Sequence, residues 1–452
     1  MASNLITLPE IFAGKVLRIP DYQRGYSWAV KKETKQMNDL WVDLQNMEEG
    51  SPHFMGIATL EKISEGSVGR WQREFQDIEE DLTVRIGEEA RTPYFVVDGQ
   101  QRLVSLTILL FLLSKDKEVL HHGDDIANIL VTSEEGGRCY HFGYEVDTPS
   151  HQFLIGTILE DQSMKVTEPE TLYTRNLVRA KEFFSKKIEE LDSFEKRRLC
   201  KKLLNNLYFN LLIMDGQTLD ISLIFETLNY RGKPLSKLEL FKNRLMYLVT
   251  KRYLDDNEQT TKLRRKITRT WLDIYEWLGK SPSRELDDDE FLKAFWIMFY
   301  DHTDRNDGDF ESVEQDIFEE KYKITDVSRN DFIRSIDIER MLDTLSDSVK
   351  YWFFMHVPDH DFITEEDNER FNYSNKIKEM LKKIFRIRYG QFLNPLILSY
   401  LLKTNGQTQI YELLAAIERH NYCVYLPDTM PRRTEPILAG WQILYFGFGR
   451  AG

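Results

Sequence analysis

The residues with the clearest chemical potential lie at positions 97–103. Here a carboxylate, two amides and a guanidinium follow one another in Val97-Asp98-Gly99-Gln100-Gln101-Arg102-Leu103. Asp-Gly favours a turn, residues 94–97 favour a strand, and the apolar run over residues 103–113 is long enough for a buried helix. The first N–H groups of such a helix lack intrahelical partners and lie at the positive end of its dipole. We therefore expect this turn to be able to hold an anion.

A second polar and aromatic stretch occupies residues 19–28. Pro20 excludes a helix interior there and Gly25 marks a bend, which predicts irregular backbone. The side chains placed on this loop are Tyr22, Gln23, Arg24, Tyr26 and Trp28. On residue types alone, the favoured interpretation is a surface loop whose aromatic rings fill the edge of a core.

A third stretch, residues 224–235, combines a tight loop with a helix start. Gly232 and Pro234 predict a turn over residues 229–233, and Ser236 and Glu239 have the spacing of a capping box. The loop offers an amide, a guanidinium and an ammonium from Asn229, Arg231 and Lys233. Taken alone, it fits a solvent-exposed turn and a ligand site equally well.

The elements that must position these stretches follow from hydrophobic periodicity. We expect a strand or short helix over residues 5–19, an amphipathic helix within 31–49, a buried strand at 54–60 and helix throughout 174–214. The polar, glycine-punctuated residues 61–92 favour a long hairpin or a mobile insertion. From residue 251 onward the pattern predicts helices only.

Length and charge limit the class of protein. A chain of 452 residues suggests two or three domains. Its 74 acidic and 60 basic residues give a net charge of −14, which argues against a surface made for indiscriminate nucleic-acid binding. The basic runs at residues 262–269 and 376–388 could form DNA-facing helix faces. Pairing with acidic runs such as residues 287–290 is the favoured alternative.

Several kinds of chemistry find no support in the sequence. The three cysteines are far apart, and neither a P-loop nor a G-x-G-x-x-G dinucleotide motif occurs. No signal peptide and no apolar run long enough to span a membrane is present. We therefore expect a protein of the reducing cytoplasm that does not enter a membrane.

In their order along the chain, the three stretches resemble the N-terminal domain of the GmrSD-type restriction endonuclease family, a ParB/sulfiredoxin-like α+β domain. The resemblance is carried by Ile19-Pro20-x-Tyr22-Gln23-Arg24-x-Tyr26-x-Trp28, Val97-Asp98-Gly99-Gln100-Gln101-Arg102-Leu103 and Phe225-x-x-Leu228-Asn229-x-x-Gly232-Lys233-Pro234-Leu235. It implies a ParB-like nucleoside-triphosphate-binding domain over residues 1–250, with a helical insertion at about 115–215. An all-α domain over residues 251–452 would follow.

The resemblance also implies a function. The protein would bind and hydrolyse a nucleoside triphosphate with Mg²⁺, within a prokaryotic anti-phage system that recognises modified foreign DNA. GTP, ATP and CTP are not distinguishable from the sequence. Relatives carry a C-terminal HNH-like nuclease domain whose Glu-His-Ile-x-x-Pro stretch is not found in this chain. We therefore expect a sensor-only protein, a subunit served by a separate nuclease chain, or a truncated form; a homo-oligomer is a further expectation.

Residue roles are carried over from the resemblance position by position. Asp98 would hold Mg²⁺ or position the attacking water, Gln100 or Gln101 would orient that water, and Arg102 would meet phosphate charge. The nucleotide would be bound by Tyr22, Gln23, Arg24, Tyr26, Trp28, Gly99, Asn229, Arg231, Gly232 and Lys233. Tyr22, Tyr26 and Trp28 would stack on a base or wall the pocket.

Two alternatives stay open at this point. The first is a non-hydrolysing DNA-binding or scaffold module with a ParB-like fold, whose arginines contact DNA phosphates. The second is a domain that itself cuts DNA. Phosphate release from several nucleoside triphosphates separates the enzyme from the scaffold.

Overall fold

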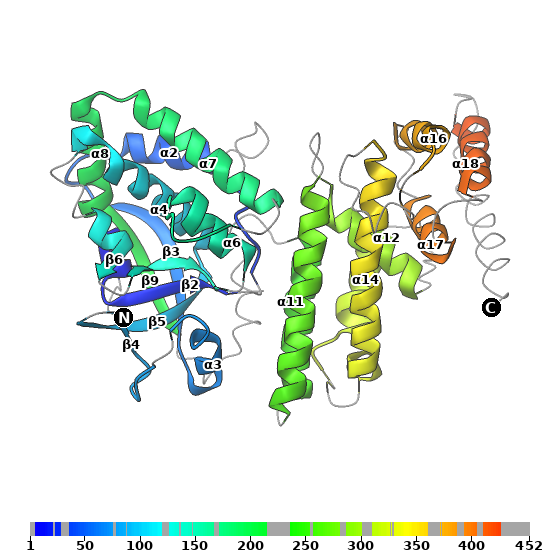
Figure 1. Cartoon of the computed structure of the whole chain (residues 1–452), viewed down its shortest axis with the longest axis horizontal. Helices are drawn as coiled ribbons and strands as arrows, with labels where there is room; N and C mark the ends of the chain where they lie inside the picture. The colour runs from blue at the N-terminus through cyan, green and yellow to red at the C-terminus, as the bar shows by residue number, and fades with distance from the viewer. Residues whose placement is uncertain are drawn as a thin grey trace. The chain divides into compact units, whose positions relative to one another are not determined.

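The computed structural model divides into two compact units, residues 1–235 and 236–452. Both are drawn in Figure 1. The residues that the structure describes are 5–20, 23–28, 36–75, 78–86, 88–119, 126–134, 137–146, 148–166, 171–214, 236–253, 256–280, 286–300, 310–325, 327, 330–359, 371, 373–386, 393–404 and 410–425.

The first unit is built on a mixed sheet. In the described residues it has seven strands, in the order β1-β9-β3-β5-β2-β8, with β4 also paired to β5. The strands are β1 (Leu5–Thr7), β2 (Lys15–Ile19), β3 (His53–Lys62), β4 (Val84–Ile86), β5 (Glu89–Asp98), β8 (Phe142–Tyr144) and β9 (Leu207–Met214). β5 runs antiparallel to β3 and parallel to β2, while β3 runs parallel to β9. A separate hairpin joins β6 (Val131–Glu134) to β7 (Gly137–Tyr140).

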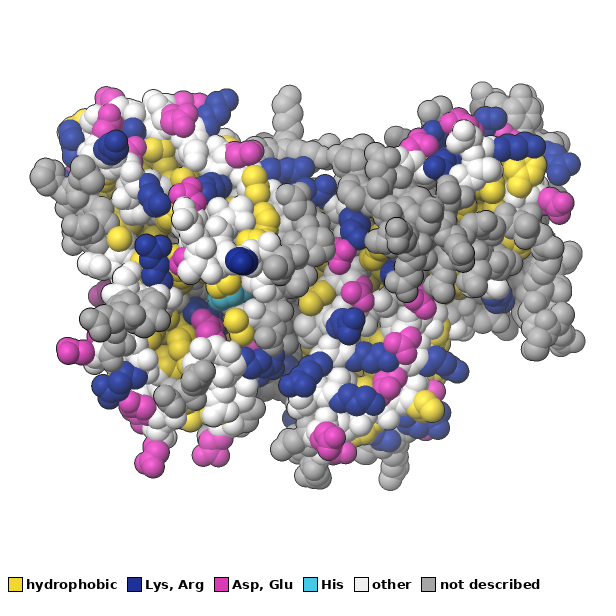
Figure 2. Space-filling view, in the orientation of Figure 1, with side chains coloured by type: hydrophobic (Ala, Val, Ile, Leu, Met, Phe, Trp, Pro, Cys, Tyr) yellow, Lys and Arg dark blue, Asp and Glu magenta, His cyan; other side chains and the backbone are white. Residues whose placement is uncertain are grey.

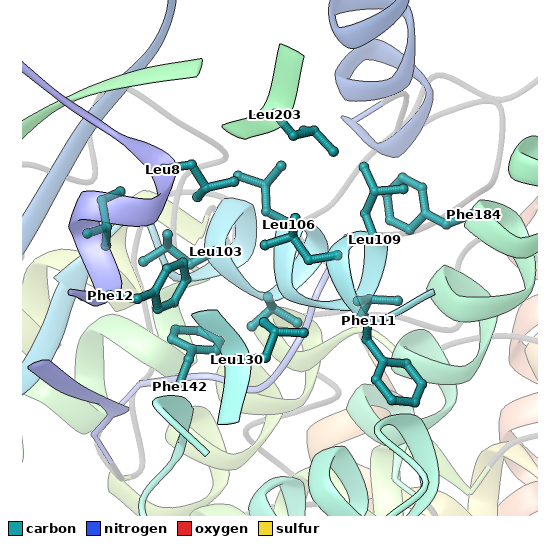
Figure 3. Close-up of a cluster of buried hydrophobic side chains, with 14 of the residues drawn as sticks. Leu8, Phe12, Leu103, Leu106, Leu109, Phe111, Leu130, Phe142, Phe184 and Leu203 are labelled. Carbon is teal, nitrogen blue, oxygen red and sulfur yellow. The ribbon is translucent and has the colours of Figure 1, made fainter. Parts of the chain in front are cut away.

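Helix α4 (Gln100–Lys115) lies at the centre of the larger core. Eleven of its sixteen residues are buried, which matches a helix that is apolar on nearly all sides. Figure 3 shows Leu103, Leu106 and Leu109 of α4 among apolar side chains from other elements. The remaining helices of this unit are α1 (Leu8–Phe12), α2 (Gln36–Asn46), α3 (Val68–Trp71), α6 (Pro149–Gln152), α7 (Leu172–Glu189) and α8 (Ser193–Asn205). Because α4 is enclosed, the turn that precedes it has a rigid support.

A smaller apolar cluster lies apart from the main core. It contains Trp71 of α3 and Phe95 of β5, whose ring centroids are 5.0 Å apart. Arg18 of β2 is buried beside it and donates from Nε to Glu74 at 2.8 Å. The short 3₁₀ turns of the unit are Glu65–Ser67 and Lys117–Val119, and a π-helical segment follows α6 at Phe153–Ile158.

Helices are the regular elements among the described residues of the second unit. Its helices are α10 (Lys237–Arg252), α11 (Asn257–Gly279), α12 (Asp288–Tyr300), α13 (Phe310–Gln315), α14 (Ser335–His356), α16 (Asn375–Arg386), α17 (Asn394–Thr404) and α18 (Ile410–Tyr425). A π-helical segment follows α13 at Asp316–Lys321, and a 3₁₀ turn precedes α14 at Asp331–Ile333. The capping box predicted for α10 is confirmed: Ser236 Oγ accepts from Glu239 N, and Glu239 Oε2 accepts from Ser236 N.

The two basic runs form ion pairs within the second unit. Lys262 of α11 lies 2.9 Å from Glu339 of α14, and Lys266 lies 2.8 Å from Asp343. Lys383 of α16 lies 3.6 Å from Glu418 of α18. Acidic and basic side chains are interleaved on the face of this unit shown in Figure 2. These contacts agree with the favoured prediction that the runs pair with acidic neighbours.

The mixed α/β character of the N-terminal part and the helices after it are confirmed, and the ParB-like fold stays a prediction. The prediction of helix over all of residues 174–214 is wrong for its last eight, which form β9. The stretch 115–215 is more than a helical insertion, because β8 and β9 belong to the main sheet. In the described segments, no helix is long and apolar enough to cross a membrane.

Candidate functional site

The helix that follows the turn between β5 and α4 begins without a capping side chain. Gly99 joins Asp98 to Gln100 with φ +94, and a Cβ there would lie 3.5 Å from the main-chain oxygen of Ile57. The positive φ favours glycine, whereas the Cβ distance is an ordinary van der Waals contact. The first intrahelical bond runs from Leu103 N to Gly99 O at 3.0 Å. The three preceding N–H groups of the helix thus lie at the positive end of its dipole, without a side-chain acceptor from the cap residue.

Arg102 fastens this turn to strand β3. Its Nη1 donates to the main-chain oxygen of Met55, and its Nη2 to that of Ile57, both at 2.7 Å. Between them lies Gly56, with φ +115, where a Cβ would come within 2.1 Å of Nη1. The β3–β9 register shifts at this point, which marks a bulge. The bulge turns two carbonyl groups toward the guanidinium and leaves the space that it fills.

Asp98 carries the carboxylate nearest to the helix start. Burial raises the pKa of this carboxyl, while Arg102, whose Nη2 lies 3.7 Å away, and the N–H of Gly99 oppose the rise. In the part of the chain that the structure describes, no group of three or more His, Cys, Asp or Glu side chains could hold a metal ion. A cation at Asp98 would therefore take its other ligands from a bound molecule or from water.

Gln101 joins the first and second stretches. Its Oε1 accepts from Ser27 N at 2.9 Å, and its Nε2 donates to Gly25 O at 3.2 Å. Gly25 also packs closely on α7, because a Cβ there would lie 2.6 Å from Tyr173. Both ends of the Gln101 amide are thus engaged with the main chain of residues 23–28. The structure places this loop against the start of α4, as a shared site requires.

Tyr26 anchors the same loop from inside the core. Its side chain is fully buried, and its hydroxyl lies 2.7 Å from Ser105 Oγ on α4. Asn176 of α7 donates to the main-chain oxygen of Tyr26 at 3.2 Å. Burial raises the pKa of Tyr26 well above its ordinary value. An enclosed ring of this kind fits an anchor better than the predicted stacking on a base, whereas Trp28 is only partly buried.

Four buried polar atoms near the turn have no hydrogen-bond partner among the described residues. They are Gln23 Oε1, Ser27 Oγ, Thr59 Oγ1 and Gln100 Oε1. Gln23 and Gln100 are 7% and 8% exposed. Thr59 lies opposite Asp98 in the β3–β5 register. Because native proteins leave few buried polar atoms unpaired, their concentration here calls for a physical explanation.

Part of the predicted site lies outside the described residues. This holds for Tyr22 and for the third stretch, which contains Asn229, Arg231, Gly232 and Lys233. Arg24 is described and partly buried. The approach of the third stretch to the other two therefore stays a prediction.

Several residues that build the site were not predicted from the sequence. Gly56, Ser105 and Asn176 hold or accommodate the predicted residues without being candidates themselves. A glycine inside an apolar strand pattern was an available signal for Gly56, because it often marks a bulge or a close approach. Ser105 and Asn176 had no comparable signal, since their partners are far away in sequence.

Comparison with known proteins adds an independent observation. Residues 7–246, which are 240 of the 452 residues, match a family model described as GmrSD restriction endonuclease, N-terminal domain. The matched range includes all three stretches. No curated protein matches the chain.

Proposed function

The chain belongs to the GmrSD restriction endonuclease family and is a component of a restriction system; from this premise we propose that it binds and hydrolyses a nucleoside triphosphate. The reaction takes place at the turn formed by residues 98–102 and the adjoining loop of residues 23–28. Nucleotide turnover then governs cleavage of modified foreign DNA by a nuclease located in another domain or another chain.

One observation carries the proposal: unpaired buried polar atoms surround a helix start that suits an anion. The N–H groups ahead of Leu103 and the dipole of α4 favour a phosphate. The carboxamide oxygens of Gln23 and Gln100 instead require hydrogen-bond donors, and each costs roughly 1–3 kcal/mol while it stays buried and unpaired. A ligand that satisfies both must carry an anionic group and neutral donors. A nucleotide combines the two.

The contacts divide the proposed roles among neighbouring residues. Asp98 shares a Mg²⁺ ion with the phosphates, an arrangement in which one carboxylate suffices because phosphate oxygens supply further ligands. Gln100 orients the attacking water, since its carboxamide oxygen has no hydrogen-bond partner among the described residues, while both ends of the Gln101 amide are engaged. Arg102 places its charge beside the helix start. Arg24, Arg231 and Lys233 supply further positive charge to the phosphates.

The test is phosphate release from GTP, ATP, CTP and UTP with Mg²⁺, measured together with calorimetric binding. Gln100→Ala is expected to lower kcat/KM by ~10- to 100-fold, because it removes a group that acts on the attacking water. Ser114→Ala is the matched control: it lies at the far end of α4, where its hydroxyl only donates to Phe111 O, and should leave turnover unchanged.

Two outcomes refute the enzyme. If the unmodified chain binds none of the four nucleotides, the site itself is wrong. If it binds DNA and nucleotide without phosphate release, it is the non-hydrolysing DNA-binding module.

A further inference from the structure

The orientation of the Gln23 amide is fixed by the strand beside it. Its Nε2 donates to the main-chain oxygens of Val96 and Val97, at 2.8 and 2.9 Å. A carboxamide nitrogen has two hydrogens, and these two acceptors use both. The opposite arrangement would set the amide oxygen against two carbonyl oxygens. Oε1 is therefore the atom that points away from β5.

This oxygen is a buried acceptor without a donor among the described residues. An amide oxygen carries no hydrogen and can only accept. A phosphate oxygen beside it would also be an acceptor, so the two could not form a hydrogen bond. The start of α4 has the opposite character, because its first N–H groups are hydrogen-bond donors without an intrahelical acceptor and suit an anion. A ligand that spans the two places must point its charged end at α4 and a neutral donor at Gln23.

We propose that Gln23 is a specificity-determining residue of this site, whose Oε1 accepts a hydrogen bond from an N–H or O–H group on the uncharged part of the nucleotide. The inference rests on the proposed function and adds the direction in which the nucleotide lies and the group by which it is selected. The donor belongs either to the base or to the ribose, which have the same chemistry toward an amide oxygen.

The first measurement needs only the unmodified full chain. Calorimetric titration with GTP, ATP, CTP and UTP identifies the tightest binder. In the ribose arm, the 2′-deoxy and 3′-deoxy forms of that nucleotide are titrated next. In the base arm, the probes are inosine and N1-methylguanosine triphosphates for GTP, purine riboside triphosphate for ATP, the 4-deamino analogue for CTP and N3-methyluridine triphosphate for UTP. One of these probes is expected to bind at least ~10-fold more weakly than the parent nucleotide, because it leaves the buried Gln23 oxygen unpaired.

The second measurement is a double-mutant cycle, in which the donor group is removed from the nucleotide and the acceptor is removed from Gln23. Gln23→Met keeps the length of the side chain and removes its polar atoms. In this variant, the parent nucleotide and the donor-deleted probe should bind within ~2-fold of each other, since the acceptor that distinguished them is gone. Gln101→Met is the matched control: it removes the bonds to Gly25 and Ser27, while Gln23 keeps its own bonds to the main-chain oxygens of Val96 and Val97. It should weaken all probes by a similar factor and preserve their ratio.

The outcomes separate this inference from the proposed function. If nucleotide binds but no ribose or base probe loses more than ~3-fold, Gln23 selects nothing and the inference is wrong. The same follows if Gln23→Met retains the discrimination, or if Gln101→Met abolishes it equally. Absence of binding by all four nucleotides overturns the proposed function together with the inference. The first of these results does not require Gln23→Met to fold.

Discussion

Replacing Gly56 by alanine tests whether the bulge in β3 exists to receive Arg102. The added Cβ would lie 2.1 Å from Nη1, so the guanidinium must leave the oxygens of Met55 and Ile57. Each bond from a charged donor contributes roughly 1.5–3 kcal/mol. The Arg102 side chain is 22% exposed, so water replaces part of the loss and the lower figure applies to each bond. Alanine at positive φ adds about 1–2 kcal/mol, and the expected total is ~4–5 kcal/mol.

Gly50 supplies the matched control. It has φ +87, and a Cβ there meets nothing within 4 Å. Gly50→Ala should therefore cost only the backbone strain of about 1–2 kcal/mol. A second control is Gly56→Ala in the Arg102→Met background, where no guanidinium remains to be displaced and the cost should fall to the same value.

The assay is amide hydrogen exchange of the full chain at increasing urea, followed on peptides from β3 and α4. These peptides report the free energy of opening of the first unit without mixing in the second. An excess cost of Gly56→Ala over Gly50→Ala of less than ~1 kcal/mol would refute the reasoning, since it would mean that Arg102 moves without loss. So would an excess that survives in the Arg102→Met background, because its cause would then lie elsewhere.

Three further predictions follow from single contacts. Tyr26→Phe should lower stability by about 1 kcal/mol, through loss of the bond to Ser105, and change nucleotide affinity less than ~3-fold; a larger change in affinity would mean that the hydroxyl acts on the nucleotide and is no mere anchor. Burial, reinforced by the carboxylate of Glu239, raises the pKa of Asp288 to about 7. The folded state then holds this proton more tightly than the unfolded chain does. The contribution of this group to the free energy of unfolding is therefore largest below pH 4, and it falls by up to roughly 1.4 kcal/mol per pH unit toward pH 7. In urea unfolding, the decline toward pH 7 should be smaller in Asp288→Asn by this contribution, while Asp289, whose pKa burial raises to about 6, still adds its own. Lys266→Ala should cost under about 1 kcal/mol, because Asp343, its ion-pair partner, is exposed. It should leave DNA affinity unchanged in a filter-binding assay, because Lys266 pairs with that carboxylate.

Local patterns predicted the elements whose causes are local. The strand before Asp98 and the apolar helix after Gly99 are confirmed, because residue type, turn chemistry and length agreed there. The capping box at Ser236 is confirmed for the same reason. These features depend on neighbours within a few positions, which the sequence displays directly.

Strand β9 is an element that such local patterns fail to predict. The leucines at positions 203, 204 and 207 continue the helical spacing of α8, so the pattern predicted helix through residue 214. The chain instead leaves the helix at Asn205 and pairs with β3, some 150 residues earlier. A buried apolar run satisfies both geometries, and the choice is made by a partner that is remote in sequence.

The two adjacent glutamines show the same limit at the site. As residue types Gln100 and Gln101 are interchangeable, and the sequence offered either one to the attacking water. The left-handed backbone of Gly99 sets the rotation at which α4 begins, and that rotation turns Gln101 toward Gly25 and Ser27 while Gln100 stays unpaired. Loss of activity in a Gln101 or Arg102 variant would therefore not identify a catalytic group, since both hold the turn and its loop in place. A catalytic group is identified only by a variant that lowers turnover and leaves hydrogen exchange at α4 unchanged. We expect this behaviour of a Gln100 variant, because the Gln100 oxygen has no partner to lose among the described residues.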